Sequence, residues 1–431
     1  MNGKLYLEQA FPVLFSEGMP NGYINNVLYW GNISREDLYK TLSDGTPAMQ
    51  MMDIDFGDTC SLKCPHCFRR DDRNDIIENP LTDEELIDYI RQGKELGVKS
   101  VKILGRGEPF QNPEFLNFLR TMTDMDIGVG IFTKGTVLGD DKMAEYYNEK
   151  YGIKSARALA DAIKELKTAI FLNFMSFNDD ISSKMVGNVS GYVEKRNNAL
   201  RNLVDAKFNE FIPGMPTRLA LVCAPYTPET VDELFDIYKF AHERNIYCVA
   251  CPTTLSGKGL DTFDRQQKSG HYAEFINKTV QEYAKIYEYA IDKGIMSIDD
   301  FIHDGPHVYP GAHPCNQTMA GFYLQLSGQV NWCPGRVESD TLCTRNIRNY
   351  KNLKECWMQS PGCRRAKQYT NETGPFNCGC IARDKRSLPN DFYEQIKDLT
   401  LEKLNCFVNG GCGKSRKMTI FRTFSNPTLG V

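Results

Sequence analysis

The chain has 431 residues, of which 41% are hydrophobic and 25% charged, a balance typical of a globular protein with enough length for two or three domains. Its formal net charge of −4 offers no basic surface to a polyanion, so we expect no nucleic-acid partner. The sequence has no run of about 18 apolar residues and no export signal, so we expect a cytoplasmic protein with no membrane partner.

The cysteine content is high, and it is unevenly distributed. Of the fifteen cysteines, three lie between residues 60 and 67, three at positions 223, 248 and 251, and nine between 315 and 412. In a reducing compartment such thiols serve as metal ligands or catalytic groups more often than as disulfides. The first and last groups therefore predict two separate metal-bearing units.

The middle of the chain predicts a parallel sheet. After an N-terminal extension at 1–48, six apolar segments alternate with helical ones, as in repeated β/α units. One helix is predicted from Leu81 to Leu96, with Thr82 as N-cap, Glu85 completing a capping box and Gly97 ending it. The predicted strands are 51–56, 99–104, 128–133, 169–178, 218–223 and 246–252. Ligands of such folds bind at the carboxyl ends of the strands.

Residues 256–310 predict a bridge that covers a substrate. The bridge has a Gly-rich turn at 256–259, a long helix at about 271–293 and a loop at 299–313. The loop contains His303, His307 and His313, but spacings of four and six in a Gly/Pro-rich loop are not a recognisable ligand set. We interpret it as a substrate-facing or merely polar loop.

Cys60, Cys64 and Cys67 form the pattern CxxxCxxC directly after the first predicted strand. Three thiolates can hold three irons of a [4Fe-4S] cube and leave the fourth iron open. The alternative is zinc, which needs a fourth ligand, and His66 cannot supply it alongside both Cys64 and Cys67 without severe strain. The pattern resembles the radical S-adenosylmethionine (SAM) superfamily. The resemblance implies an α/β fold, a partial (β/α)6 TIM-like barrel over 49–255, and a cluster that cleaves SAM reductively to a 5′-deoxyadenosyl radical.

The second predicted strand ends in a stretch similar to the GGEP motif of that family. Gly105, Gly107, Glu108 and Pro109 match, and the resemblance implies that this stretch binds the amino group of SAM. A glycine here lets the backbone approach a ligand closely. Arg106 departs from the motif, and either reaches a substrate carboxylate or phosphate as a catalytic residue or is solvated.

The resemblance implies four further cofactor-binding residues. Thr133 lies in a variant of the TNG element, Ser176 ends the fourth strand, and Arg218 belongs to the fifth. His66 stands where the family usually has an aromatic residue against the adenine. For Ser176, the alternative is a serine that merely ends a strand.

Cys223 and Cys251 lie at the ends of the fifth and sixth strands, near the expected radical site. Either could donate a hydrogen atom to a substrate radical, as in radical epimerases. The alternative is an ordinary buried thiol, which is the commoner case.

Residues 315–333 predict a β-hairpin that begins and ends in a cysteine. It resembles the opening of the SPASM and twitch domains of radical SAM enzymes. The resemblance implies a small C-terminal α+β Fe-S domain at 311–431 with one auxiliary [4Fe-4S] cluster, held by Cys315, Cys333, Cys378 and Cys380. The later SPASM cysteine run is absent, so a second cluster from Cys343, Cys363, Cys406 and Cys412 is a weaker alternative, and a zinc knuckle is another.

The resemblance predicts a radical SAM oxidoreductase or epimerase that acts on a sugar- or aminoglycoside-like small molecule. The alternative is a maturase of ribosomally made peptides, although no leader-binding module is evident. A non-catalytic Fe-S or zinc scaffold is a third reading. As an enzyme of this kind, it needs an external electron donor such as flavodoxin or ferredoxin.

Overall fold

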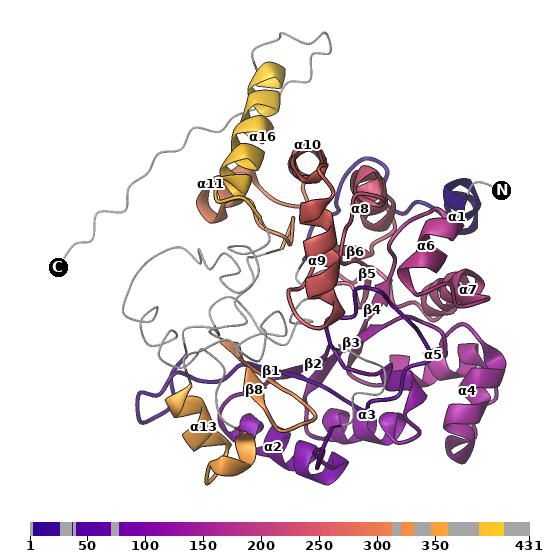
Figure 1. The fold of residues 1–431 in the computed structure, drawn as a ribbon, viewed down its shortest axis with the longest axis vertical. Coiled ribbons are helices and arrows are strands. Elements are labelled where there is room, and N and C mark those ends of the chain that lie inside the picture. Colours follow the sequence, from indigo (N-terminus) through magenta and orange to yellow (C-terminus); the bar gives the residue numbers. More distant parts are fainter. Residues whose placement is uncertain are drawn as a thin grey trace.

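A curved, open sheet of eight strands organises the computed structural model, which describes residues 3–25, 37, 40–69, 77–312, 320–331, 346–360 and 388–408 (Figure 1). The strand order is β6-β5-β4-β3-β2-β1-β7-β8, and only β8 runs antiparallel to its neighbour. The α/β class and the partial-barrel arrangement predicted from the sequence are confirmed. The strands are β1 (Met51–Ile54), β2 (Ser100–Ile103), β3 (Gly128–Thr133), β4 (Thr168–Asn173), β5 (Leu219–Cys223), β6 (Tyr247–Ala250), β7 (Gly321–Leu324) and β8 (Val330–Asn331).

Helices connect β1 to β6 and cover the outer face of the sheet (Figure 1). They are α2 (Asp83–Glu95), α3 (Phe115–Asp124), α4 (Asp141–Asn148), α5 (Ala156–Lys164), α6 (Asp179–Met185), α7 (Tyr192–Asp205) and α8 (Leu234–His242), with short 3-10 turns η3 (Pro109–Gln111), η4 (Glu149–Tyr151) and η5 (Val231–Glu233). Each strand-to-helix connection returns the chain to the same edge of the sheet, so the carboxyl ends of β1–β6 lie together.

Alternate strand residues build two apolar clusters. Ile54, Ile103 and Leu221 belong to the large core between the sheet and its helices. Phe171 and Val249 belong to a smaller cluster on the opposite, inner face. This period of two decides which strand residues face the inside of the partial barrel.

The sequence located α2 correctly. Thr82 accepts a hydrogen bond from the Glu85 backbone N–H at 3.2 Å, and the Glu85 carboxylate accepts one from the Thr82 N–H at 2.9 Å. This capping box satisfies backbone donors at the helix start, and the helix ends at Leu96 as predicted. The long helix predicted at about 271–293 is α10 (Tyr272–Asp292).

The bridge differs from its prediction in two places. The sequence predicts a loop from 299 onward, but the first part of this stretch is the helix α11 (Ile298–Asp304). Ser297 and Asp300 form a second capping box at its start. The Gly-rich turn leads directly into α9 (Lys258–Lys268). His303 is in the last turn of α11, His307 is buried, and His313 lies outside the described residues.

The predicted hairpin is present, since β7 and β8 pair antiparallel. Its first strand also pairs parallel with β1, with Met51 opposite Gly321 and Ile54 opposite Leu324. The hairpin therefore extends the barrel sheet, although a domain boundary at 310/311 stays a prediction. The 3-10 turn η6 (Ile347–Asn349) and helices α13 (Leu353–Gln359) and α16 (Phe392–Val408) follow.

The N-terminal residues of the chain pack against α8. In α1 (Gly3–Ala10), Lys4 forms a 2.6 Å ion pair with Asp236, and the Phe11 ring lies edge-on to Phe240 at 6.4 Å. The described helices include none that is both long and apolar enough to cross a membrane.

Candidate active site at the carboxyl end of the sheet

The cysteine loop, residues 57–69, leaves β1 at its carboxyl end and carries Cys60, Cys64 and Cys67, all three half-buried. Two backbone contacts fix its position. The Lys63 N–H donates to the Val186 carbonyl at 3.1 Å, and the Lys258 N–H donates to the Cys67 carbonyl at 2.9 Å. The loop is thus held between the end of α6 and the start of α9.

The three thiols lie close enough to affect one another electrostatically. Burial raises the pKa of Cys60 to about 12, and the Glu108 carboxyl and the other two cysteines add to the effect. Burial likewise raises the pKa of Cys64, where the Lys134 charge opposes it. Protonated thiols are poor ligands, so binding here requires a positively charged centre that draws the protons off.

The thiols do not converge on a single point. Within the described ranges, no group of three His, Cys, Asp or Glu side chains is placed to hold one metal ion. Zinc would need such convergence, whereas three thiolates that each bind a different iron of a cube do not.

The motif loop, residues 105–109, packs backbone to backbone against the cysteine loop. The Glu108 N–H donates to the Thr59 carbonyl at 2.7 Å. A Cβ placed on Gly107 would lie 2.8 Å from the same carbonyl oxygen and 3.1 Å from that of Gly57. Only glycine allows this approach, which explains why the motif needs it here. Gly105, with a φ of 27°, turns the chain out of β2, and Pro109 begins η3.

Glu108 joins the ends of β2 and β3. Its carboxylate accepts a hydrogen bond from the Thr133 hydroxyl at 2.5 Å and one from the Lys134 N–H at 2.8 Å. The side chain is buried, and burial raises its pKa, while the hydrogen bonds from Thr133 and Lys134 act in the opposite direction. The structure thus brings Thr133 and Glu108 together beside the cysteine loop.

Gln111 is a site residue that sequence reasoning missed. Its amide accepts a hydrogen bond from the Ser61 N–H at 3.1 Å and donates one to the Ser61 hydroxyl at 2.7 Å. These bonds tie η3 to the cysteine loop directly after Cys60. No local pattern signals this contact, because the two residues are 50 positions apart.

His66 has an unsatisfied polar side chain. It is 7% exposed, and neither ring nitrogen has a hydrogen-bond partner among the residues that the structure describes. Burial, with the nearby Lys134 charge as a smaller cause, lowers its pKa to about 3, so the imidazole is neutral. Buried polar atoms without partners are rare in folded proteins. The imidazole therefore has hydrogen-bonding capacity available to a bound molecule.

One of the two predictions for Arg106, a solvated side chain, is wrong. It is 7% exposed, so it is not solvated, and its Nε donates to the Asp58 carboxylate at 2.7 Å. The ion pair links the motif loop to the start of the cysteine loop, 48 residues away in sequence. This ion pair supports the position of the motif loop, and contact of Arg106 with a substrate stays a prediction.

Ser176 lies beyond the carboxyl end of β4, whereas Arg218 lies at the amino end of the sheet. The Ser176 hydroxyl donates to Glu233 at 2.5 Å beyond the end of β4, and its side chain is fully buried. Arg218 precedes β5, and its guanidinium donates to the carbonyls of Lys164, Leu166 and Thr168 at the amino end of β4. The amino end is opposite to the cysteine loop, so the structure does not bring Arg218 to the site.

The two candidate catalytic thiols face opposite sides of the sheet. Cys223 belongs to the outer core, and its thiol contacts the Phe174 carbonyl at 3.0 Å. Cys251 belongs to the inner cluster with Phe171 and Val249. Only Cys251 is therefore on the inner side, and a role for Cys223 as hydrogen donor would require a different orientation.

The candidate auxiliary ligands lie outside the described residues. This holds for the whole of Cys315, Cys333, Cys343, Cys363, Cys378, Cys380 and Cys412, and for the side chain of Cys406. Cys356, which is described, is fully buried in α13. It packs within the outer core.

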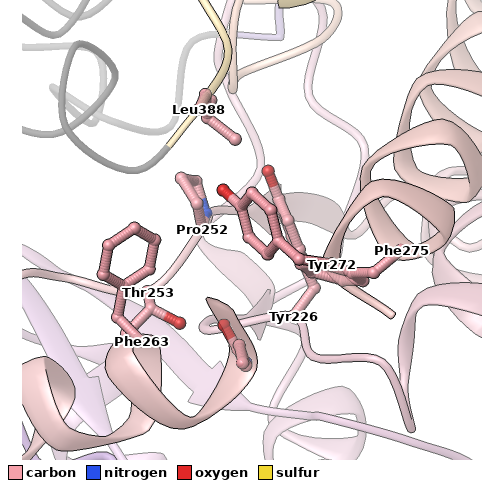
Figure 2. A pocket seen from close by; sticks show the side chains of 8 residues that line it. Tyr226, Pro252, Thr253, Phe263, Tyr272, Phe275 and Leu388 are labelled. Carbon is pink, nitrogen blue, oxygen red and sulfur yellow. The ribbon is translucent and has the colours of Figure 1, made fainter. Parts of the chain in front are cut away.

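A pocket opens beside the site, between the segments that follow β5 and β6 (Figure 2). Its walls come from the segments after these two strands, from α9 and α10, and from the chain before α16. The lining is aromatic and uncharged: Tyr226, Pro252, Thr253, Phe263, Gln266, Tyr272, Phe275 and Leu388. Thr253 is 3% exposed, and its hydroxyl has no hydrogen-bond partner.

Fold and site together define a parallel β/α protein with three cysteines close together at the carboxyl edge of its sheet. Residues 54–241 match the family model of the radical SAM superfamily. The family implies a [4Fe-4S] cluster with SAM. Three clustered thiols, the unsatisfied imidazole of His66 and the close approach at Gly107 fit such a group.

Known structures were also compared with the chain. It is similar to Streptococcus suis SuiB bound to S-adenosylmethionine, with 16% identity, a TM-score of 0.46 and coverage of 75% of this chain and 69% of that one. It is also similar to SuiB bound to the precursor peptide SuiA, with 18% identity, a TM-score of 0.43 and coverage of 75% and 68%. No curated protein matches the sequence significantly.

Proposed function

We propose that this chain is an enzyme that binds SAM and a [4Fe-4S] cluster through Cys60, Cys64 and Cys67 and oxidises or epimerises a small molecule. One observation carries the proposal. The three-cysteine loop and the Gly107–Glu108 stretch pack directly on each other at the carboxyl edge of a parallel sheet, within the residues that match the radical SAM family. Ligands of parallel β/α folds bind at that edge.

When bound, the cluster and SAM supply a 5′-deoxyadenosyl radical, which abstracts a hydrogen atom from the substrate. The chain's own residues hold and shield the reactants. The backbone carbonyl groups of the motif loop would accept hydrogen bonds from the amino group of SAM, and buried Glu108 keeps this loop against β3. His66 contacts the adenosyl group with its free ring nitrogens or its flat face.

The inner face of the sheet supports a polar small-molecule substrate. It places Asp53 of β1 opposite Lys102 of β2. These groups can bind hydroxyl or amino groups of a sugar-like molecule. A ribosomally made peptide is the alternative substrate, since a leader-binding module can be a separate protein.

We further propose an auxiliary cluster held by Cys315, Cys333, Cys378 and Cys380, which would accept an electron from the substrate. Iron analysis tests this proposal. A Cys60/Cys64/Cys67 triple Ala variant is expected to retain about four irons for one auxiliary cluster and about eight for two. Retention of zinc in place of iron would support the zinc knuckle.

The decisive experiment is SAM cleavage. Anaerobically reconstituted protein, reduced with dithionite or flavodoxin, is expected to convert SAM to 5′-deoxyadenosine, measured by chromatography. Cys60→Ala is expected to abolish this conversion, and Cys356→Ala is the matched control because its thiol lies in α13, within the outer core. Absence of cleavage by the wild type, or equal cleavage by Cys60→Ala, would refute the proposed function.

A further inference from the structure

One buried carboxylate, that of Asp55, joins the cysteine loop to the β7–β8 hairpin. It accepts hydrogen bonds from Arg69 Nη2 at 3.1 Å and Nε at 3.4 Å, both on the carboxyl-terminal arm of the cysteine loop. It also accepts one from the Tyr323 hydroxyl at 2.5 Å and one from the Leu326 N–H at 3.0 Å. Four donors from two segments more than 250 residues apart thus meet on one side chain.

These contacts form an interior network. The Asp55 side chain is 0% exposed and the Arg69 side chain 8% exposed, so water does not screen their ion pair. The Arg69 guanidinium also lies over the Tyr323 ring, 5.2 Å from its centre, in cation–π geometry. Arg69 is therefore held by both partners at once.

The location gives this network a role beyond stability. Asp55 directly follows β1, and Arg69 follows Cys67 by two residues. Backbone contacts at Lys63 and Cys67 hold the middle of the cysteine loop, as described above. Arg69 is its anchor on the carboxyl-terminal side, and that anchor is shared with a hairpin that lies between Cys315 and Cys333 in the sequence.

We propose that Asp55 is a positioning residue that sets the geometry of the cysteine loop and couples it to the hairpin. The inference rests on the proposed function, because it concerns the loop assigned to the cluster and SAM. Any shift of the hairpin is transmitted through Tyr323 and Arg69 to the loop, and the reverse also holds.

The test compares Asp55→Asn with Glu85→Gln in the full chain. Glu85 of α2 forms an ion pair at 2.6 Å with Arg348, which follows the hairpin, and neither residue belongs to the cysteine loop. Two readouts are used: amide hydrogen exchange of a 60–69 peptide in metal-free protein, and the SAM concentration that half-saturates the change in the EPR spectrum of reduced, reconstituted protein.

For Asp55→Asn we expect exchange in the 60–69 peptide to quicken, and half-saturating SAM to rise, by about tenfold, as for loss of hydrogen bonds to a charged group. Glu85→Gln should leave both readouts unchanged. If Asp55→Asn fails to fold, Tyr323→Phe removes a single hydrogen bond of the network. For this variant we expect the exchange rate of the 60–69 peptide and the half-saturating SAM concentration each to rise about threefold. Unchanged readouts in the folded variant would overturn the inference, whereas a wild type with no SAM-induced spectral change would overturn the proposed function.

Discussion

Burial of the Asp53 carboxyl beside Lys102 makes the stability of this protein depend on pH. The two residues are register partners on β1 and β2 and lie 3.4 Å apart, with side-chain exposures of 1% and 11%. Burial raises the pKa of Asp53 from 3.8 to about 6, and the Lys102 charge only partly opposes this rise.

The sign follows from proton binding. Since the folded state holds the Asp53 proton more tightly than the unfolded state, stability is highest below pH 3.8 for this group and falls as the pH rises to about 6. The difference corresponds to about 3 kcal/mol, of which about 1.4 kcal/mol is lost between pH 5 and 7.5. Asp53→Asn removes this dependence but leaves Lys102 buried without its counter-charge, which costs about 3–5 kcal/mol.

Urea unfolding of metal-free protein at pH 5 and 7.5 provides the assay. We expect the difference between the two pH values to shrink by about 1.4 kcal/mol in Asp53→Asn. Asp53→Asn/Lys102→Met, which removes both charges, should recover the lost stability at pH 7.5 and exceed the wild type by about 1–4 kcal/mol. An identical pH dependence in wild type and Asp53→Asn would refute the argument.

Three further predictions concern single contacts. Gly107→Ala should cost about 1–3 kcal/mol and weaken SAM binding measured by EPR, because its Cβ meets the Thr59 carbonyl; unchanged SAM binding would contradict this. Gly152→Ala is its control, because the φ of 72° there strains an alanine while no atom lies within 4 Å of the added Cβ. Thr82→Ala should cost about 1 kcal/mol in urea unfolding without changing SAM cleavage, and no loss would mean that the capping box is redundant. Trp357→Ala should lower the free energy of unfolding by about 3–5 kcal/mol, since the indole is fully buried and donates to the Pro47 carbonyl at 2.8 Å. A loss under about 1 kcal/mol would show that α13 does not pack on the core.

Local patterns explain why the strands and most helices could be predicted. The six barrel strands are short apolar segments bounded by turn residues, and each was located to within a few residues. The capping box at Thr82 identified α2 in the same way. The box at Ser297 and Asp300 carries the same signal, but histidine, glycine and proline nearby favoured a loop, and α11 was missed.

Contacts between distant residues account for the errors at the site. The partner of Arg106 is 48 residues away, so sequence alone left its side chain either at the substrate or in water. The parallel pairing of β7 with β1 joins residues about 270 positions apart, and the hairpin pattern specifies only its internal pairing. Arg218 was grouped with the carboxyl-edge residues, although it precedes its strand and therefore lies at the other edge.

The distinction between local patterns and contacts between distant residues also explains what the CxxxCxxC spacing does and does not specify. The spacing fixes which thiols can share a cluster, because three cysteines within eight residues stay close in any compact loop. It does not fix where the cluster faces. That orientation comes from Glu108, Gln111 and Asp55, which hold the loop against β2, η3 and the hairpin. A variant that keeps all three cysteines but loses one of these contacts should therefore still bind iron, but with the cysteine loop in a different orientation.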